Sequence, residues 1–118
     1  MELSVKKSGD VAVVAVTGVI DLTKSPDLRE RVMGLVGEGI RGLVVDLSKV
    51  KYLDSSGMAT LVDVLNRLRA AGGKMVVAGL PGEMREMFRI TRLDKRFTFA
   101  PDTSLAVESM KKALKNGT

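Results

Sequence analysis

The sequence predicts an α/β protein whose mixed, mostly parallel sheet is packed with about four helices. Short β-branched runs alternate with longer stretches of helical periodicity, a pattern typical of parallel strands joined by right-handed crossovers. The first two apolar runs, residues 3–5 and 11–20, are separated only by a Lys-Lys-Ser-Gly-Asp segment. Because Ser, Gly and Asp favour tight turns, these two runs predict an N-terminal β-hairpin followed by βα units.

The length and composition indicate one folded unit. The 118 residues include 45% apolar and 28% charged side chains, which is ordinary for a globular domain. No internal repeat, linker or low-complexity segment interrupts the chain. We therefore expect a single domain over residues 1–118, with residues 115–118 as a frayed tail.

The first half of the chain contains one predicted helix and one predicted buried strand after the hairpin. Ser25 is a plausible helix cap because Pro26 follows it at a first-turn position. Apolar residues then recur at helical spacing until Gly37. Residues 43–47 are β-branched and nearly continuous, which is typical of a strand buried on both faces.

The second half repeats this alternation. A helix beginning near Met58 is closed by two glycines, and residues 74–78 predict another buried strand. A shorter helix and a strand at residues 97–99 follow, and Asp102 is positioned to cap a final helix. Residues expected inside these last two helices are Met84, Met87, Phe88, Leu105, Val107, Met110 and Leu114.

The absence of two residue types restricts the chemistry. The chain contains no cysteine and no histidine, which excludes disulfides, thiolate nucleophiles and the usual zinc ligands. A serine nucleophile would have no histidine to activate it, and glycine-rich phosphate-binding motifs are absent. We therefore expect no enzymatic activity, no bound metal and no cofactor.

Charge and hydropathy indicate where the protein works. The net charge is +5, but basic and acidic residues are interleaved along the chain, and aromatic residues make up only 3%. Few aromatic side chains are therefore present on which nucleic-acid bases could stack, and direct nucleic-acid binding is not expected. No secretory signal is visible, and the longest apolar run is far shorter than a membrane span. The expected location is the cytoplasm, without membrane association.

One segment combines features that suit chemical modification. Asp54-Ser55-Ser56-Gly57 lies where a buried strand is expected to lead into a helix. A helix N-terminus offers free backbone N–H groups and a partial positive charge. Asp54 or Ser55 can cap the helix, and Gly57 allows another backbone to approach. Taken alone, the segment is more typical of a plain helix cap, although two hydroxyls there also suit phosphorylation.

The surrounding sequence resembles a known family. The lead-in Val50-x-Tyr52-Leu53 before the Asp-Ser-Ser-Gly segment, and Gly18-Val19-Ile20-Asp21 after the hairpin, are similar to segments of STAS domains. The resemblance extends from residue 3 to about residue 114. Among proteins with STAS domains, the chain resembles the anti-sigma factor antagonists that regulate sporulation and stress-response sigma factors in bacteria.

The resemblance implies a partner-switching function. It implies that Ser56 is phosphorylated by an anti-sigma factor that is also a serine kinase and supplies the ATP. The unphosphorylated chain would bind that kinase and free a sigma factor for transcription, and a serine phosphatase would restore binding. The implied partner-binding residues are Asp21, Asp54, Ser55, Gly57 and Met58. For Asp21, capping the loop before the first helix is an equally good explanation.

A second function within the same family stays open. The chain could be a STAS scaffold or ligand-binding module, as in a stressosome or a lipid-transport complex. Methionines adapt to irregular partners, but core filling is the better explanation for Met33, Met58, Met75, Met84, Met87 and Met110. Joint exposure of Met84, Met87 and Phe88 would instead make the third helix a docking surface.

Overall fold

The order of helices and strands agrees with the prediction. The structure is a computed structural model that describes residues 1–21 and 23–116. A short 3-10 turn, Leu93–Lys95, lies between α3 and β5. The elements are β1 (Glu2–Ser8), β2 (Val11–Ile20), α1 (Ser25–Gly37), β3 (Gly42–Leu53), α2 (Ser55–Ala70), β4 (Lys74–Ala78), α3 (Gly82–Ile90), β5 (Thr98–Ala100) and α4 (Thr103–Lys115).

The sheet is mixed and mostly parallel, as expected. Its strand order is β1-β2-β3-β4-β5, so each strand pairs with its neighbours in sequence. β1 and β2 are antiparallel, and the remaining pairs are parallel. The hairpin turns at Gly9, whose φ of +63° falls in the left-handed region that glycine adopts without strain.

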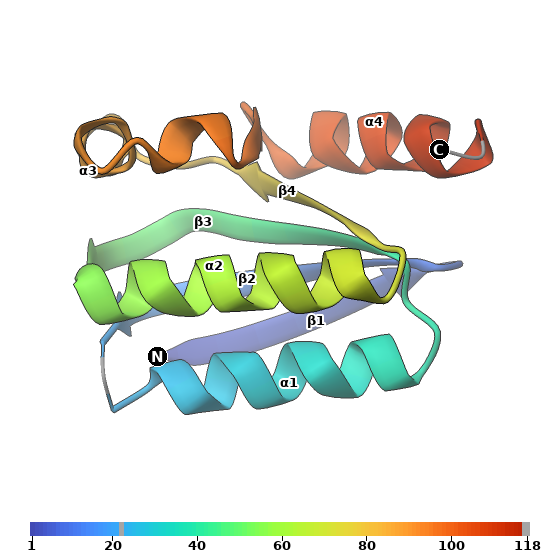
Figure 1. Ribbon diagram of the computed structural model, residues 1–118, viewed down its shortest axis with the longest axis horizontal. Helices are drawn as coiled ribbons and strands as arrows, with labels where there is room; N and C mark the ends of the chain where they lie inside the picture. Colours follow the sequence, from blue (N-terminus) through green and yellow to red (C-terminus); the bar gives the residue numbers. More distant parts are fainter. Residues whose placement is uncertain (22, 117–118) are drawn as a thin grey trace.

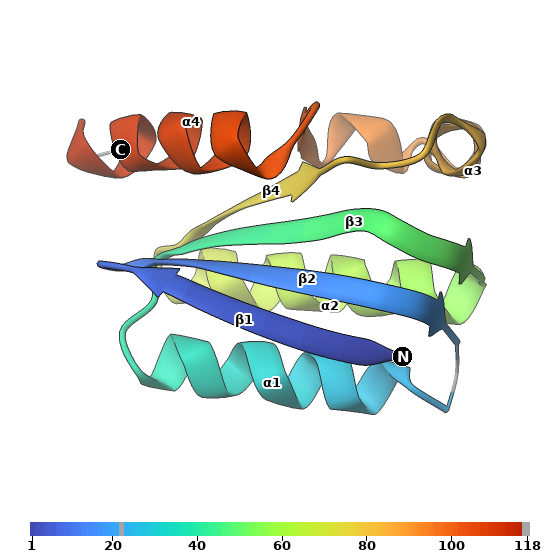
Figure 2. The same cartoon turned by 180° about the vertical axis from the view of Figure 1, so that it is seen from behind.

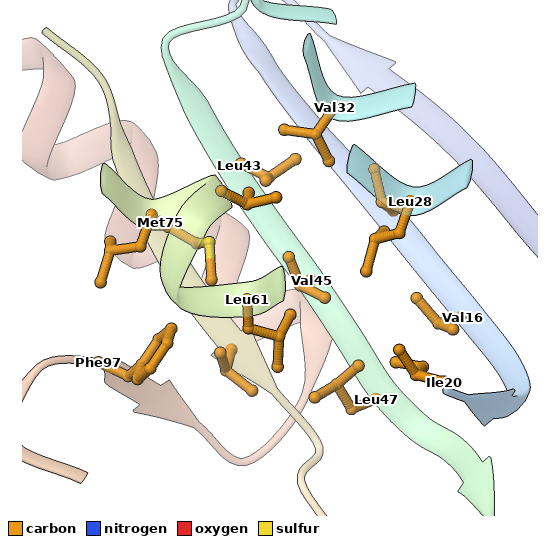
Figure 3. Close-up of a cluster of buried hydrophobic side chains, with 14 of the residues drawn as sticks. Val16, Ile20, Leu28, Val32, Leu43, Val45, Leu47, Leu61, Met75 and Phe97 are labelled. Atoms are coloured by element: carbon orange, nitrogen blue, oxygen red, sulfur yellow. The ribbon is translucent and has the colours of Figure 1, made fainter. Parts of the chain in front are cut away.

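Helices cover both faces of the sheet, and the larger core lies on the face of α1 and α2. α2 lies in front of the sheet in Figure 1 and behind it in Figure 2. Side chains of α1, α2 and α3 pack with one face of β2, β3 and β4, while Ala106 and Met110 of α4 pack on the opposite face. Figure 3 shows part of the larger core, including Val16, Ile20, Leu28, Val32, Leu43, Val45, Leu47, Leu61, Met75 and Phe97.

β3 is much longer than the five-residue strand expected from the sequence. It continues to Leu53, and its pairing with β2 shifts between Gly18 and Val19. Gly18 pairs with Val50 and Val19 pairs with Tyr52, so Lys51 is an extra residue, as in a β-bulge. The extra residue places Val50 and Leu53 inside and Lys51 and Tyr52 outside. β3 therefore runs directly up to Asp54, which precedes the first residue of α2.

The predicted start of α1 is wrong in detail. Lys24 is the N-cap residue, and no side chain caps this helix end. The hydroxyl of Ser25 is instead used as a donor, to the carbonyl oxygen of Asp21 at 2.8 Å. Ser25 is buried, and its hydroxyl closes the turn from Asp21 instead of capping the helix.

Two expectations about α4 also need correction. Leu105 is 50% exposed, although it was expected inside. It precedes the buried Met110 by five residues, which places the two side chains about 140° apart around the helix. α4 continues to Lys115, so the helix includes the first residue of the stretch expected to fray. Residues 117–118 lie outside the described part of the chain.

Candidate functional site

The two aspartates singled out from the sequence follow neighbouring strands at the same edge of the sheet. β2 ends at Ile20 and β3 ends at Leu53, and these two residues are paired in register. The backbone N–H of Asp54 donates to the carbonyl of Ile20 at 3.5 Å. Asp21 and Asp54 therefore leave adjacent parallel strands at their carboxyl ends, where binding sites of α/β sheets are usually found.

Asp54 caps helix α2 through its side chain. Its backbone is extended, with φ −96° and ψ −175°, and its Oδ1 accepts the N–H of Gly57 at 2.9 Å. The first intrahelical bond runs from the N–H of Met58 to the carbonyl of Asp54. The N–H groups of Ser55 and Ser56 precede that bond and have no intrahelical acceptor, so they face outward at the positive end of the helix.

The hydroxyls of Ser55 and Ser56 are free for chemistry. Ser55 is exposed and Ser56 is half-buried. Within residues 1–21 and 23–116, neither hydroxyl forms a hydrogen bond to another protein group. The only side-chain bond to Ser56 is made by its carbonyl oxygen, which accepts the hydroxyl of Thr60 at 3.0 Å. Ser56 is thus partly exposed, and its hydroxyl oxygen is not used in a hydrogen bond within the described residues.

Gly57 brings the helix start against the end of β2. A Cβ at this position would lie 2.4 Å from Cδ1 of Leu53 and 2.7 Å from the carbonyl oxygen of Ile20. No side chain fits there without moving the backbone of β2. The close backbone approach expected at Gly57 is therefore present, and Gly57 itself is buried.

Met58 does not suit the partner contact expected of it. Its side chain is 4% exposed and belongs to the larger core. A side chain in that position packs between the start of α2 and the core, and it offers little surface to another protein. Of the expected partner-binding residues, Asp21, Asp54 and Ser55 have accessible side chains.

Asp21 organises the loop between β2 and α1. Its Oδ1 accepts the hydroxyl of Thr23 at 2.7 Å and the N–H groups of Thr23 and Lys24 at 3.1 and 3.2 Å. The hydrogen bond from the Thr23 hydroxyl, aided by the two backbone N–H groups and the charge of Lys24, lowers the pKa of the Asp21 carboxyl. The loop-capping role is therefore confirmed, and it keeps the carboxylate ionised beside the start of α2.

Tyr52 is a candidate site residue that was not predicted from the sequence. The only tyrosine of the chain is 54% exposed and lies two residues before Asp54. Its exposure follows from the bulge at Lys51, which turns Tyr52 outward. Exposed aromatic residues next to a polar site are frequent anchors of protein interfaces. The signal in the sequence was an aromatic residue in a chain that has few of them.

The third helix does not form the alternative docking surface. Met84 is 7% exposed, Phe88 is fully buried, and Met87 is half-buried. Met58, Met75 and Met110 also lie in the core, so core filling explains most of the methionines.

In the described part of the chain, no group of acidic side chains could hold a metal ion. No described helix is both long and apolar enough to cross a membrane.

Comparisons with known proteins identify the family. The model of the STAS domain matches residues 2–106. The anti-sigma-B factor antagonist of Bacillus subtilis is 29% identical over 93 residues, which are 79% of this chain and 84% of that protein. The crystal structure of an anti-sigma factor antagonist from Mycobacterium paratuberculosis is 29% identical, covers 93% of both chains and has a TM-score of 0.82.

A more distant structure has the same fold. The Bacillus cell fate determinant SpoIIAA, solved in its phosphorylated form, has a TM-score of 0.69 at 14% identity. The match covers 99% of this chain and 100% of that one. An identity this low bears on the fold alone, whereas the family model spans nearly all of the sequence. The chain belongs to the STAS domain family.

Proposed function

We propose that the chain is an anti-sigma factor antagonist controlled by phosphorylation of Ser56. Relatives that align over most of the chain bear the name of anti-sigma factor antagonists. The observation on which the proposal depends is the free hydroxyl of Ser56 in the first turn of α2, which Asp54 caps, at the sheet edge where Asp21 also follows its strand. Unphosphorylated, this surface binds an anti-sigma factor and thereby frees a sigma factor for transcription.

Ser56 is a better phosphate acceptor than its neighbours. A transferred phosphoryl group there lies near the unused N–H groups of Ser55 and Ser56, which favour negative charge. The hydroxyl of Thr60 is bonded to the carbonyl of Ser56 and is buried, so it is unavailable. In the proposed cycle, the anti-sigma factor acts as the kinase and supplies ATP, and a serine phosphatase removes the phosphate.

Charge alone accounts for the switch. Phosphorylation adds a charge of about −1.5 to −2 at neutral pH. At the positive end of α2 that charge leaves the fold intact, but in a complex it would be desolvated close to the Asp54 carboxylate. A buried charge without a partner costs several kcal/mol. Because about 2.7 kcal/mol changes an affinity a hundredfold, one phosphate is enough to end binding.

Mass spectrometry of the chain recovered from the cells that produce it tests the proposal. We expect a single phosphate on Ser56 in part of the population, and none in a Ser56→Ala variant. Ser55→Ala is the matched control, because it removes the neighbouring hydroxyl and should leave the phosphate in place. A phosphate on Ser55 alone, or none under any growth condition, would contradict the assignment.

Affinity capture tests the partner. We expect the Ser56→Ala chain to retain an anti-sigma factor from the same cells, because it cannot be phosphorylated. Capture of a lipid-transport or stressosome subunit in its place would favour the scaffold function. The chain would then remain a STAS domain with a different partner.

A further inference from the structure

The strand β1 presents a free edge. It is the first strand in the sheet order, and no described segment pairs with its outer side. All seven residues of β1 pair with β2, so the strand is fully extended and regular. Edge strands of this length expose unpaired N–H and C=O groups, which are a template for pairing with another strand.

The side chains of β1 alternate cleanly between the two faces. Leu3 and Val5 are half-buried and pack against the larger core, whereas Glu2, Ser4 and Lys6 are exposed. Lys7 follows the same alternation as Leu3 and Val5, and it forms an ion pair with Glu38 beyond the end of α1. The face of Leu3 and Val5 is therefore the face covered by α1.

A groove lies between this face of β1 and α1. Its volume is about 570 Å³, and its walls include Leu3 and Val5 on one side and Glu30 and Gly34 on the other. A Cβ added at Gly34 would meet no atom within 4 Å, so the α1 wall is open. Figure 2 shows β1 at the margin of the sheet with α1 beneath it. Apolar side chains of an added strand would find room here.

We propose that β1 pairs with β1 of a second copy of this chain, antiparallel and about a two-fold axis at Ser4. In this register Leu3 lies opposite Val5 of the second copy, and Glu2 lies opposite Lys6. Both contacts occur twice because the interface is isologous. The apolar pairs extend the larger core, the charged pairs lie on the exposed face, and the two five-stranded sheets become continuous.

The sequence of β1 favours this register over its neighbours. A shift by one residue would turn the apolar side chains of one copy to the wrong face, since side chains alternate. A shift of the axis to Val5 would place Lys7 opposite Leu3 and Lys6 opposite Ser4, and the pairing of opposite charges would be lost. A shift to Lys6 would place like charges together. Among the registers that keep Leu3 and Val5 on one face, only the one about Ser4 places Glu2 opposite Lys6, and this charge complementarity identifies a second copy as the partner.

The proposed dimer is independent of the proposed function. Glu2 pairs with Thr17 near the carboxyl end of β2, so Asp21 and Ser56 lie toward the first residues of β1. Because the two β1 strands run antiparallel, the two Ser56 sites would point in opposite directions. Pairing at this edge therefore leaves both sites accessible, and its failure would not bear on Ser56.

Sedimentation of charge variants tests the pairing. We expect the unmodified chain to form a dimer, and Glu2→Lys or Lys6→Glu alone to raise its dissociation constant at least about tenfold, since two favourable pairs become two repulsive ones. An equimolar mixture of the two single variants should dimerise again, because each chain then supplies the charge that the other lacks. The double variant Glu2→Lys/Lys6→Glu should also dimerise.

Two results would overturn the proposal. One is an unmodified chain that stays monomeric at about 1 mM, where even a weak dimer of that dissociation constant is half formed. The other is single variants that dimerise as tightly as the unmodified chain, or a mixture that fails to recover the dimer. Thermal unfolding at a concentration where every variant is monomeric is the control, and we expect it to be unchanged because both side chains are exposed.

Discussion

Helices α2 and α4 begin in nearly the same way, and the comparison separates capping from function. α2 begins with Asp54-Ser55-Ser56-Gly57 and α4 with Asp102-Thr103-Ser104-Leu105. Each aspartate is an extended N-cap whose Oδ1 accepts the third following N–H, at 2.9 Å for Gly57 and 2.8 Å for Leu105. Ser56 and Ser104 therefore occupy equivalent positions.

The two helix starts differ in their surroundings. Gly57 is pressed against the carbonyl of Ile20, Asp21 follows Ile20 at the end of β2, and the exposed Tyr52 precedes the cap Asp54 by two residues in sequence. At the equivalent position of α4, Leu105 is 50% exposed. The two helix starts therefore share the cap and the hydroxyl and differ in what surrounds them. The chain provides its own control for the proposed function.

The largest expected difference between the two helices is in partner binding. Ser56→Asp should weaken binding to the captured anti-sigma factor about a hundredfold, which corresponds to about 2.7 kcal/mol. Ser104→Asp introduces the same charge at the equivalent position of α4 and should change the affinity less than about twofold, which is under 0.5 kcal/mol. Isothermal titration measures both. Equal losses would mean that net charge, and not the site, controls binding.

A second difference is expected in stability at the third helical residue. Gly57→Ala should lower the free energy of unfolding by about 1–3 kcal/mol, because its Cβ meets the backbone of β2. Leu105→Ala removes an exposed side chain and should change it by no more than about 0.5 kcal/mol. Urea denaturation measures both values. A Gly57→Ala protein of unchanged stability would contradict the close packing at Ile20.

The caps themselves should contribute equally. Asp54→Ala and Asp102→Ala should each cost about 1 kcal/mol of unfolding free energy, because each removes one bond to an orphan N–H. Asn in place of either aspartate should recover most of this, since its side-chain oxygen can accept the same bond. A much larger cost at Asp54, also measured in urea, would show that its carboxylate supports more than the cap.

The smallest expected effect concerns acid stability and Asp21, whose carboxylate caps the loop before α1. Its pKa in the folded chain is lowered, so its stabilising contribution is complete above its ordinary pKa of 3.8 and is lost as the pH falls through the folded value. Asp21→Asn should therefore make stability less dependent on pH below 3.8. NMR titration of the carboxyl carbon measures the pKa directly. A value at or above 3.8 would contradict the bond from Thr23.

The sequence predicted local features well because local physics decides them. The hairpin follows from turn residues, and the caps at Asp54 and Asp102 follow from side chains that can reach the next N–H groups. The bulge at Lys51 could not be predicted, because it depends on how β3 pairs with β2. The exposure of Tyr52 was missed for the same reason. Leu105 was expected inside because it is apolar, but its position around the helix axis relative to the buried Met110 was not considered.

The contact between Gly57 and the carbonyl of Ile20 bears on how fast the proposed switch can change state. The contact packs the start of α2 directly against the end of β2, with no side chain between them. The position of the Ser56 hydroxyl on the surface is therefore fixed. Adding or removing a phosphate there would change the local charge within a closely packed frame that need not reorganise. In the proposed cycle, the lifetime of each signalling state would then depend on the turnover of the proposed kinase and phosphatase, with no conformational delay of its own.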